Sequence, residues 1–342
     1  MNSRQPLRCL WIRTEATPEL GYGHLQRTLS VAATISDLWR LPAAFLMSDE
    51  SDDAPVRAFG AEVVRLPEPS VDRLIAAIDP DLGPLVLDLR ALTFEDVAAL
   101  DRAGVCTIVF DDQRWLRNAP ATALIDYTPC PASTATVGPH HYFGLDYFPL
   151  RREFLGRRAP AAGPTIREVV VTFGGSDPDD LTFRVVEALR RYPTSWTSTV
   201  LLGPGYRGRV AAGTHGQIVV RRAVTTMGEI FAESDLAIAG AGGTALELAA
   251  MGVPAFLYIL SDDQAAIASA LAEAGAAVSL GRANGFDGAQ LSRLVEQLAA
   301  DAASRRTMQA AGPRLIDGRG AERVARAIAD AWTAHRARMV RR

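Results

Sequence analysis

One histidine of this sequence stands in a setting that favours chemistry. His24 follows a short apolar run, Cys9–Arg13, and opens a stretch of helical periodicity that extends to Leu38. Gly21 and Gly23 allow the backbone to turn tightly before this helix. The positive field of a helix N-terminus disfavours the imidazolium, so the ring can accept a proton or polarise a water molecule. His24 is the candidate catalytic residue, and the alternative is a histidine that only caps or packs at a helix start.

A glycine-rich turn in the second half is the candidate phosphate site. Leu236–Ala239 has the pattern of a buried strand, Gly240–Gly243 that of a turn and Thr244–Met251 that of a helix. Such a turn aims backbone N–H groups and the positive end of a helix dipole at one point, which suits an anion. Glu247, one turn into the helix, can accept hydrogen bonds from the hydroxyls of a nearby sugar. The alternative is that the glycines only allow close packing and Glu247 lies in solvent. The candidate nucleotide-binding residues of this segment are Gly240, Ala241, Gly242, Gly243, Thr244 and Glu247.

A second glycine-containing loop, Thr172–Pro178, also follows a predicted strand. Ser176 or Asp177 can cap the next helix, with Pro178 at its first position, and this alone explains the loop. Gly174, Gly175 and Ser176 also let a ligand approach the backbone. We expect this loop to contact the nucleotide through backbone N–H groups and the serine hydroxyl.

Carboxylates end two strands of the first half, at Asp88 and at the pair Asp111 and Asp112. Adjacent acids can supply a catalytic carboxylate or a metal ligand, but neighbours on a strand point in opposite directions, so at most one faces a ligand. The three cysteines are widely spaced, without a C-x-x-C pair, and are expected to be reduced thiols. We expect no metal and no cofactor.

Apolar runs alternate with helical patterns in both halves, which predicts an α/β fold of two Rossmann-like, doubly wound parallel-sheet domains. The predicted domains are residues 1–155 and 166–325, followed by a C-terminal helix over 326–342, with an interdomain linker at Phe154–Thr165. Two such domains that face a central cleft would bring their strand C-termini together, where sheets of this kind bind ligands. Predicted elements include the strand Ala123–Asp126 and the helices Asp179–Arg191 and Met227–Glu233.

Composition limits the partners. The 342 residues carry a net charge of −3, with 22% charged and 48% hydrophobic residues, as expected of a globular protein that does not bind nucleic acid. Arginines interrupt the first residues, which argues against a signal peptide. Leu236–Leu260 is long enough to span a membrane, but its glycines, Pro254 and Glu247 favour strand, turn and helix. We expect a cytoplasmic monomer or weak homodimer without a membrane span.

Four segments, taken in their order along the chain, resemble one known family. They are G-Y-G-H-L-Q-R-T-L (Gly21–Leu29), F-G-L-D-Y-F-P-L-R-R-E-F (Phe143–Phe154), T-F-G-G-S-D-P (Thr172–Pro178) and A-G-A-G-G-T-A-L-E-L…G-V-P (Ala239–Pro254). They resemble the PseG/SpsG group of GT-B-fold proteins, which includes a UDP-sugar hydrolase of pseudaminic acid synthesis. This group is related to the MurG-type glycosyltransferases, and the resemblance covers about Leu10 to Arg323.

The resemblance implies that the second domain binds a nucleoside diphosphate, with the glycine turn on the phosphates and Glu247 on the ribose. Asp263 and Gln264 match a polar pair near the nucleotide or sugar, and His24 matches the histidine that positions or activates the attacking water. Arg27, one helical turn after His24, can pair with an anionic ligand or with a surface carboxylate. The candidate substrate-binding residues are Gly21, Tyr22, Gly23, Arg27, Asp88, Asp263 and Gln264.

The implied function is hydrolysis of a nucleotide sugar, most simply a UDP-linked amino or deoxy sugar, at its anomeric centre with release of the nucleoside diphosphate. Two alternatives stay open: a GT-B glycosyltransferase that moves the sugar to an acceptor hydroxyl, and a non-catalytic nucleotide-sugar-binding protein. The chain departs from the hydrolases after Asp88, where residues 89–92 contain no tyrosine, and after Asp112, where the usual His/Asp/Asn run is missing. These departures leave the sugar and the hydrolysis open.

Overall fold

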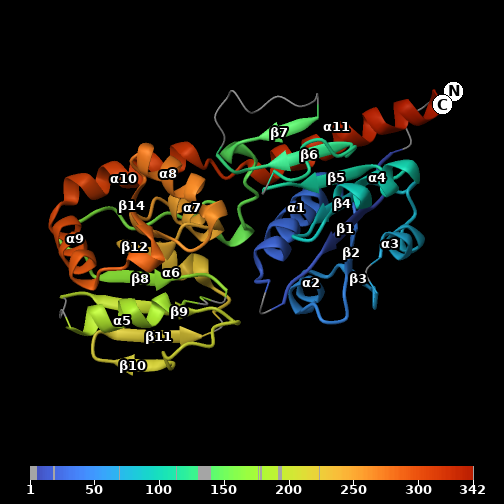
Figure 1. The fold of residues 1–342 in the computed structure, drawn as a ribbon. Helices are drawn as coiled ribbons and strands as arrows, with labels where there is room; N and C mark the ends of the chain where they lie inside the picture. Colours follow the sequence, from blue (N-terminus) through green and yellow to red (C-terminus); the bar gives the residue numbers. More distant parts are fainter. Residues whose placement is uncertain are drawn as a thin grey trace. The chain divides into compact units, whose positions relative to one another are not determined.

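The chain forms two compact units, and its C-terminal segment returns to the first of them. The computed structural model describes residues 6–17, 20–68, 70–112, 114–129, 140–175, 177, 179–191, 195–222 and 224–341, without the side chain of His215. The first unit combines Met1–Arg151 with Arg319–Arg342, and the second is Arg152–Gly318. Each unit contains one seven-stranded sheet with helices packed on it (Figure 1). The predicted α/β architecture of two parallel-sheet domains is confirmed.

The first sheet is parallel throughout, in the order β3-β2-β1-β4-β5-β6-β7. Its strands are β1 (Leu10–Thr14), β2 (Ala43–Met47), β3 (Glu62–Arg65), β4 (Leu85–Asp88), β5 (Thr107–Phe110), β6 (Ala123–Asp126) and β7 (His141–Phe143). Every residue of β2, β4, β5 and β6 is buried, as expected of a parallel sheet covered on both faces. The strand order reverses between β1 and β4. In such sheets this switch point, at the carboxyl ends of the strands, is where ligands bind.

Helices from both ends of the chain cover the first sheet. They are α1 (Gly23–Trp39), α2 (Ala54–Phe59), α3 (Val71–Ala77), α4 (Phe94–Arg102) and α11 (Gly320–Val340), with a short 3₁₀ helix η2 (Leu145–Tyr147). α3 and α4 contact each other over an apolar core that includes Leu74, Leu87 and Leu100. The last helix, which the sequence left as a separate element, packs within this unit against α1, η2 and β6 (Figure 1).

The second sheet repeats this plan in the order β10-β11-β9-β8-β12-β13-β14, with β10 antiparallel to β11 and the other neighbours parallel. Its strands are β8 (Glu168–Thr172), β9 (Thr197–Leu202), β10 (Gly213–His215), β11 (Ile218–Arg222), β12 (Leu236–Gly240), β13 (Ala255–Ile259) and β14 (Ala277–Arg282). The switch point lies between β8 and β12. Both glycine-containing loops singled out in the sequence follow these two strands.

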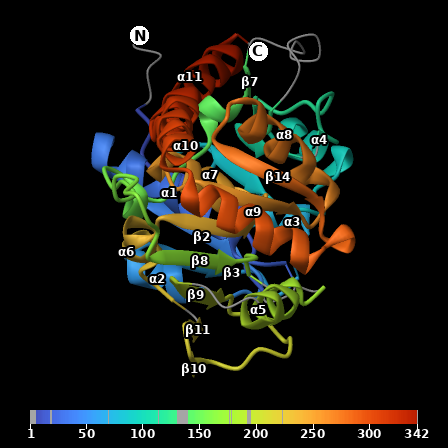
Figure 2. The same cartoon turned by 90° about the vertical axis from the view of Figure 1, so that its left-hand side faces the viewer.

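The helices of the second unit are seen along another direction in Figure 2. They are α5 (Leu181–Arg191), α6 (Met227–Glu233), α7 (Gly243–Met251), α8 (Ala265–Glu273), α9 (Gly288–Ala300) and α10 (Ala302–Leu315), with 3₁₀ helices η3 (Arg152–Phe154), η4 (Asp262–Gln264) and η5 (Ala283–Gly285). α10 packs against α7 and α9. Among the described helices, none combines the length and apolar character needed to cross a bilayer.

The segment predicted as an interdomain linker is part of the second unit. Arg305, 1% exposed, donates to the carbonyls of Leu298 at 2.7 Å, of Ala299 and of Gly163. Gln309 donates from Nε2 to the carbonyl of Pro160 at 2.7 Å and accepts from the N–H of residue 162 at 3.1 Å. The Pro- and Gly-rich composition therefore marks an irregular segment that α10 holds by hydrogen bonds.

The start of α11 packs closely against the backbone of Phe148, and a substitution of Gly320 tests this contact. A Cβ on Gly320 would lie 1.9 Å from the carbonyl oxygen of Phe148, so an alanine must displace the helix or the loop. Gly320→Ala is expected to lower the stability of the first unit by about 1–3 kcal/mol, the usual result of overpacking. Gly285→Ala, where a Cβ meets nothing within 4 Å, is the control and should change stability by less than about 0.5 kcal/mol. Calorimetric melting with equal effects of the two variants would contradict this close contact.

Candidate functional site

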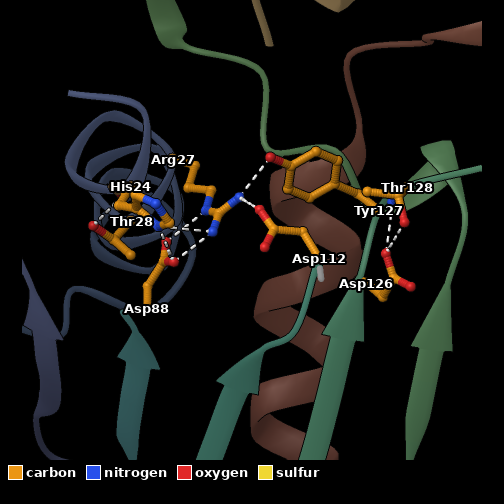
Figure 3. A network of polar contacts seen from close by, with 8 residues as sticks. All are labelled: His24, Arg27, Thr28, Asp88, Asp112, Asp126, Tyr127 and Thr128. Carbon is orange, nitrogen blue, oxygen red and sulfur yellow. Dashed lines mark hydrogen bonds and ion pairs between the residues drawn. The ribbon is translucent and has the colours of Figure 1, made fainter. Parts of the chain in front are cut away.

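His24 and Asp88 meet at the switch point of the first sheet. His24 lies in the first turn of α1, after β1, and Asp88 is the last residue of β4 (Figure 3). Nδ1 of His24 lies 2.6 Å from Oδ1 of Asp88, with side-chain exposures of 14% and 0%. When Nδ1–H donates to this carboxylate, Nε2 carries the lone pair, and Nε2 makes no hydrogen bond to any residue that the structure describes. The ring therefore has the arrangement of a general base oriented by a carboxylate.

Arg27 holds Asp88 in this position. Its Nε donates to Oδ2 and its Nη2 to Oδ1 of Asp88, each at 2.5 Å. Its Nη1 donates to Asp112 at 2.7 Å and to the hydroxyl of Tyr127 at 2.5 Å. Arg27 is only 6% exposed, and each of its three nitrogens donates to at least one protein acceptor (Figure 3). The residue expected to meet an anionic ligand or a surface carboxylate instead binds the buried carboxylate of Asp88 and the partly exposed one of Asp112, and it positions the partner of His24.

Aromatic rings and charge pairing compensate the burial of this cluster. The guanidinium carbon of Arg27 lies 5.3 Å from the ring centre of Phe110 and 5.2 Å from that of Tyr127, within the range of cation–π attraction. Nη2 of Arg27 also lies 3.0 Å from Nδ1 of His24, but this is a close approach of two donors if Nδ1–H points to Asp88.

The charge pairing also sets the ionisation of the cluster. Burial by itself raises the pKa of Asp88, but attraction to Arg27 and His24 outweighs it and brings the pKa to about 2. Burial lowers the pKa of Arg27, and Asp88 more than reverses this, so the pKa lies well above its ordinary value. Burial raises the pKa of Tyr127. Asp88 is therefore an anion, and Tyr127 a neutral donor and acceptor, at neutral pH.

The two adjacent acids after β5 have different partners. The Asp111 carboxylate accepts from the backbone N–H groups of Trp115 at 2.9 Å and Leu116 at 3.0 Å, whereas Asp112 binds Arg27. Burial raises the pKa of Asp111 to about 6, more than these two hydrogen bonds lower it. In the described part of the chain, no three or more His, Cys, Asp or Glu residues are grouped so that they could hold a metal.

Of the two glycines around the start of α1, only Gly21 has a backbone conformation that favours glycine. Gly21 has φ +79°, a conformation that favours glycine, and its N–H donates to the carbonyl of Thr17 at 2.8 Å. A Cβ on Gly23 would meet nothing within 4 Å. The hydroxyl of Tyr22 donates to Asp52 at 3.0 Å, so this predicted substrate-binding residue has a protein partner.

A cavity of about 940 Å³ opens beside His24 within the first unit. His24 and Asp88 line it together with loop residues that follow β1, β2 and β4. Leu74, Leu87 and Leu100, side chains of the apolar core, also line it. A volume of this size matches that of small-molecule sites.

The two helices at the second switch point differ at their N-termini. Both carboxylate oxygens of Asp177 accept from the first turn of α5, from the N–H groups of Leu181 at 3.0 Å and Thr182 at 2.7 Å. α7 begins after Gly242 without a side-chain cap. A carboxylate thus occupies the first helix end. At the second, the N–H of Ala245 donates to the carbonyl of Gly242 at 2.9 Å, and the N-cap residue supplies no side-chain acceptor. Asp177 is the cap that the sequence analysis offered as one of two choices, and Ser176 lies outside the described residues.

The loops around α7 are closely packed. Gly174 has φ +81°, and a Cβ on Gly203 would lie 2.3 Å from the carbonyl oxygens of both Gly174 and Gly175. Nε2 of Gln264 would lie 3.3 Å from a Cβ on Gly242, while its Oε1 accepts from the N–H of residue 260 at 3.1 Å. Gln264 therefore packs against the glycine turn and is held there.

The remaining candidates of the second unit differ in exposure. Glu247 is 6% exposed on α7, so the alternative that it lies in solvent is wrong. Ala241 is buried, and its N–H donates to the carbonyl of Tyr258 at 2.9 Å. Asp263 is exposed in η4. The structure thus brings Gly240, Gly242, Gly243, Thr244 and Gln264 together around the start of α7.

Comparison with known proteins places this geometry in a wider group. No family model matches the chain. It is 26% identical over 203 residues to the spore coat polysaccharide biosynthesis protein SpsG of Bacillus subtilis (strain 168), a match that covers 56% of this chain and 58% of SpsG. The chain spans little more than half the length of the curated relatives that it matches, 54% and 58%.

The fold of nearly the whole chain matches that of solved structures. MurG of Acinetobacter baumannii superposes with a TM-score of 0.69 at 15% identity, over 94% of this chain and 99% of MurG. The spinosyn rhamnosyltransferase SpnG, solved with thymidine diphosphate, superposes with a TM-score of 0.63 at 15% identity, over 93% of this chain and 98% of SpnG. The protein thus has the GT-B fold of two Rossmann-like, parallel-sheet domains. SpsG is a sequence relative, so the chain is similar to the SpsG/PseG-like proteins of this fold, in agreement with the resemblance seen in the sequence.

Two features of the site were missed by sequence reasoning. Asp88 was singled out as a sugar-binding residue, but its contact with His24 depends on β1 and β4 being neighbours, and the sequence does not show the strand order. Tyr127 follows β6 directly, in the position of a residue at the carboxyl edge of the sheet, and only that position could have pointed to it.

The charge on Asp88 makes the stability of the first unit depend on pH. Because its folded pKa of about 2 lies below the ~3.9 of an unfolded aspartate, its contribution is present above pH 4 and lost as the pH falls towards 2. The stability difference between wild type and Asp88→Asn is therefore expected to shrink by about 2–3 kcal/mol from pH 5 to pH 2. Urea unfolding at each pH measures it, with the exposed Asp49→Asn as control. A difference that stays constant with pH would show that Asp88 is not an ionised partner of Arg27.

Proposed function

We propose that this protein is a nucleotide-sugar-dependent enzyme of the glycosyltransferase type. The second unit holds the nucleoside diphosphate, and the first unit holds the acceptor and the catalytic base. The observation that carries the proposal is the contact between His24 and Asp88, 2.6 Å long, at a switch point beside a cavity of about 940 Å³. A binding protein has no need of a histidine whose Nδ1 is fixed by a buried carboxylate.

The uncapped N-terminus of α7 supports the assignment of the diphosphate to the second unit. Its N–H groups and dipole favour a group that carries negative charge, whereas Asp177 already fills the end of α5. Glu247, buried one turn into α7, is the acceptor we assign to the ribose hydroxyls. The thymidine diphosphate bound to SpnG is in keeping with this assignment.

The proposed chemical step uses the groups already named. Nε2 of His24 takes the proton of an acceptor hydroxyl, whose oxygen forms a bond to the anomeric carbon of the sugar. The bond from that carbon to the diphosphate oxygen breaks, and the leaving diphosphate keeps the electron pair. Asp88 stabilises the imidazolium that forms, and Arg27 keeps Asp88 in place. The N–H groups of α7 stabilise the charge on the leaving group.

Transfer is favoured over hydrolysis by the cavity. A cavity of about 940 Å³ beside His24 has room for an organic acceptor, and a water nucleophile does not need a space of this size. The relative SpsG is named a spore coat polysaccharide biosynthesis protein, and transfer of a sugar to an acceptor is consistent with that name. Hydrolysis is the second candidate because the G-Y-G-H-L-Q-R segment, Gly21–Arg27, resembles the hydrolases of the PseG group.

Release of nucleoside diphosphate from candidate nucleotide sugars distinguishes the two reactions. We expect slow release with the nucleotide sugar alone and faster release once an amphiphilic alcohol acceptor is added. Rapid turnover that no acceptor accelerates would establish hydrolysis and overturn transfer.

Replacement of His24 tests the base. His24→Asn retains a side-chain N–H for Asp88 but has no equivalent of Nε2, so the fold should persist while turnover drops about 10²–10⁴-fold. Affinity for the nucleoside diphosphate, measured by calorimetry, should be unchanged because it rests on the second unit. Full activity in this variant would reduce His24 to a packing residue.

Replacement of Glu247 tests the nucleotide site. Glu247→Ala is expected to weaken binding of the nucleoside diphosphate by about 1–3 kcal/mol, through loss of charge-assisted hydrogen bonds to the ribose. Glu229→Ala removes an exposed carboxylate from α6 of the same unit and should leave affinity unchanged. Equal affinities of wild type and Glu247→Ala in calorimetry would refute the assignment.

A further inference from the structure

Trp115 is exposed in a way that packing does not explain. Its side chain is 71% exposed, the highest value among the large apolar residues that the structure describes as exposed. Tryptophan is among the residues that proteins bury most on average, because exposing its large ring to water is costly. The next residue, Leu116, is 5% exposed and belongs to the core of the first unit.

The loop that carries Trp115 is fixed on both sides of the ring. Asp111 accepts from the backbone N–H of Trp115 at 2.9 Å and of Leu116 at 3.0 Å. Arg114 has φ +62°, which is unfavourable for a residue with a side chain, and its Nε donates to Asp126 at 2.8 Å. Its Nη2 donates to the hydroxyl of Thr128 at 3.1 Å and to the carbonyl of residue 129 at 2.9 Å. The strained backbone is thus held by an ion pair and hydrogen bonds, and it presents the indole to solvent.

The same loop belongs to the candidate active site. Asp112, three residues before Trp115, binds the guanidinium that orients Asp88. The loop follows β5, the neighbour of β4, on the side away from β1. The cavity beside His24 is lined by loops after β1, β2 and β4, and Trp115 is not one of its lining residues. His24 and Asp88 therefore have the cavity on one side and the Trp115 loop on the other, along the carboxyl edge of one sheet.

We propose that Trp115 is a stacking platform for a pyranose ring of the substrate. The C–H groups on one face of a pyranose are weakly positive and apolar, and they complement the electron-rich face of an indole. A rigid, exposed ring gives such a contact with little loss of conformational freedom on binding. The inference deepens the proposed function, in which the ring belongs either to the sugar of the nucleotide donor or to a glycoside acceptor.

Binding of a simple pyranoside tests the platform without catalysis. Methyl β-D-glucopyranoside, whose H1, H3 and H5 share one face, is followed by saturation-transfer NMR on the whole protein, with glycerol as a polyol that lacks a ring. We expect transfer to these three protons in the wild type and roughly five- to tenfold weaker binding in Trp115→Ala. Trp115→Phe, which retains an aromatic face, should keep most of the signal.

Trp39 gives a matched control. It is 37% exposed and ends α1, at the opposite edge of the sheet from the carboxyl ends of the strands, so Trp39→Ala should leave the transfer unchanged. A signal that is absent in the wild type, or equal in Trp115→Ala and wild type, overturns the proposal. Competition by a nucleotide sugar but not by the free nucleoside diphosphate assigns the platform to the donor sugar, and no competition by either assigns it to a glycoside acceptor.

The outcome is independent of the proposed reaction. If no nucleotide sugar releases nucleoside diphosphate while the pyranoside signal still depends on Trp115, the platform is supported and the proposed function is refuted. If release depends on His24 while the pyranoside signal is the same in Trp115→Ala and wild type, the proposed function is supported and the platform is refuted.

Discussion

The pairing of Arg27 with Asp88 is the interaction on which the first site depends. Both side chains lie in the protein interior, where an unpaired charge would cost several kcal/mol. Two parallel hydrogen bonds from Arg27 hold the Asp88 carboxylate, and Oδ1, which accepts one of them, also binds Nδ1 of His24. Asp112 and Tyr127 complete the shell around the same guanidinium. One arginine thus links α1, β4 and the loops after β5 and β6 into a single polar cluster.

The second unit contains two neighbouring helix N-termini, and only one of them is capped by a side chain. Asp177 neutralises the start of α5 from within the protein, at the cost of a positive φ of 45°. α7 begins after Gly242, which has no side chain that could do the same, and Gln264 packs beside this turn. The two neighbouring helix ends are therefore chemically distinct although both follow a strand and a pair of glycines. That difference, rather than the glycines alone, makes one of them suitable for a phosphate.

Much of the secondary structure could be predicted from the local pattern of apolar and polar residues. The strand Ala123–Asp126 and the helix Met227–Glu233 lie where the sequence predicts them, since buried runs and amphipathic stretches are local properties. The helix expected from Asp179 begins at Leu181 because Asp180 has φ +50°, which no propensity indicates. Short elements such as α2 and β7 carry too few residues for a periodic signal. The sequence identified His24, Arg27 and Asp88 as separate candidate residues. It did not indicate the hydrogen bonds between them, because these depend on which strands become neighbours.

The return of the chain to the first unit has a consequence for its biosynthesis. α11 packs on α1 and β6, yet all of the second unit is made between them. At ribosomal rates this corresponds to roughly 10 to 30 seconds during which the nascent first unit lacks its last helix. Ile35 of α1 and Ile328 of α11 are both fully buried in the folded chain, and the contact between these two helices can form only after that interval. The nascent chain therefore exposes an apolar surface that chaperones can bind, and the first unit completes its folding only after the second has been made.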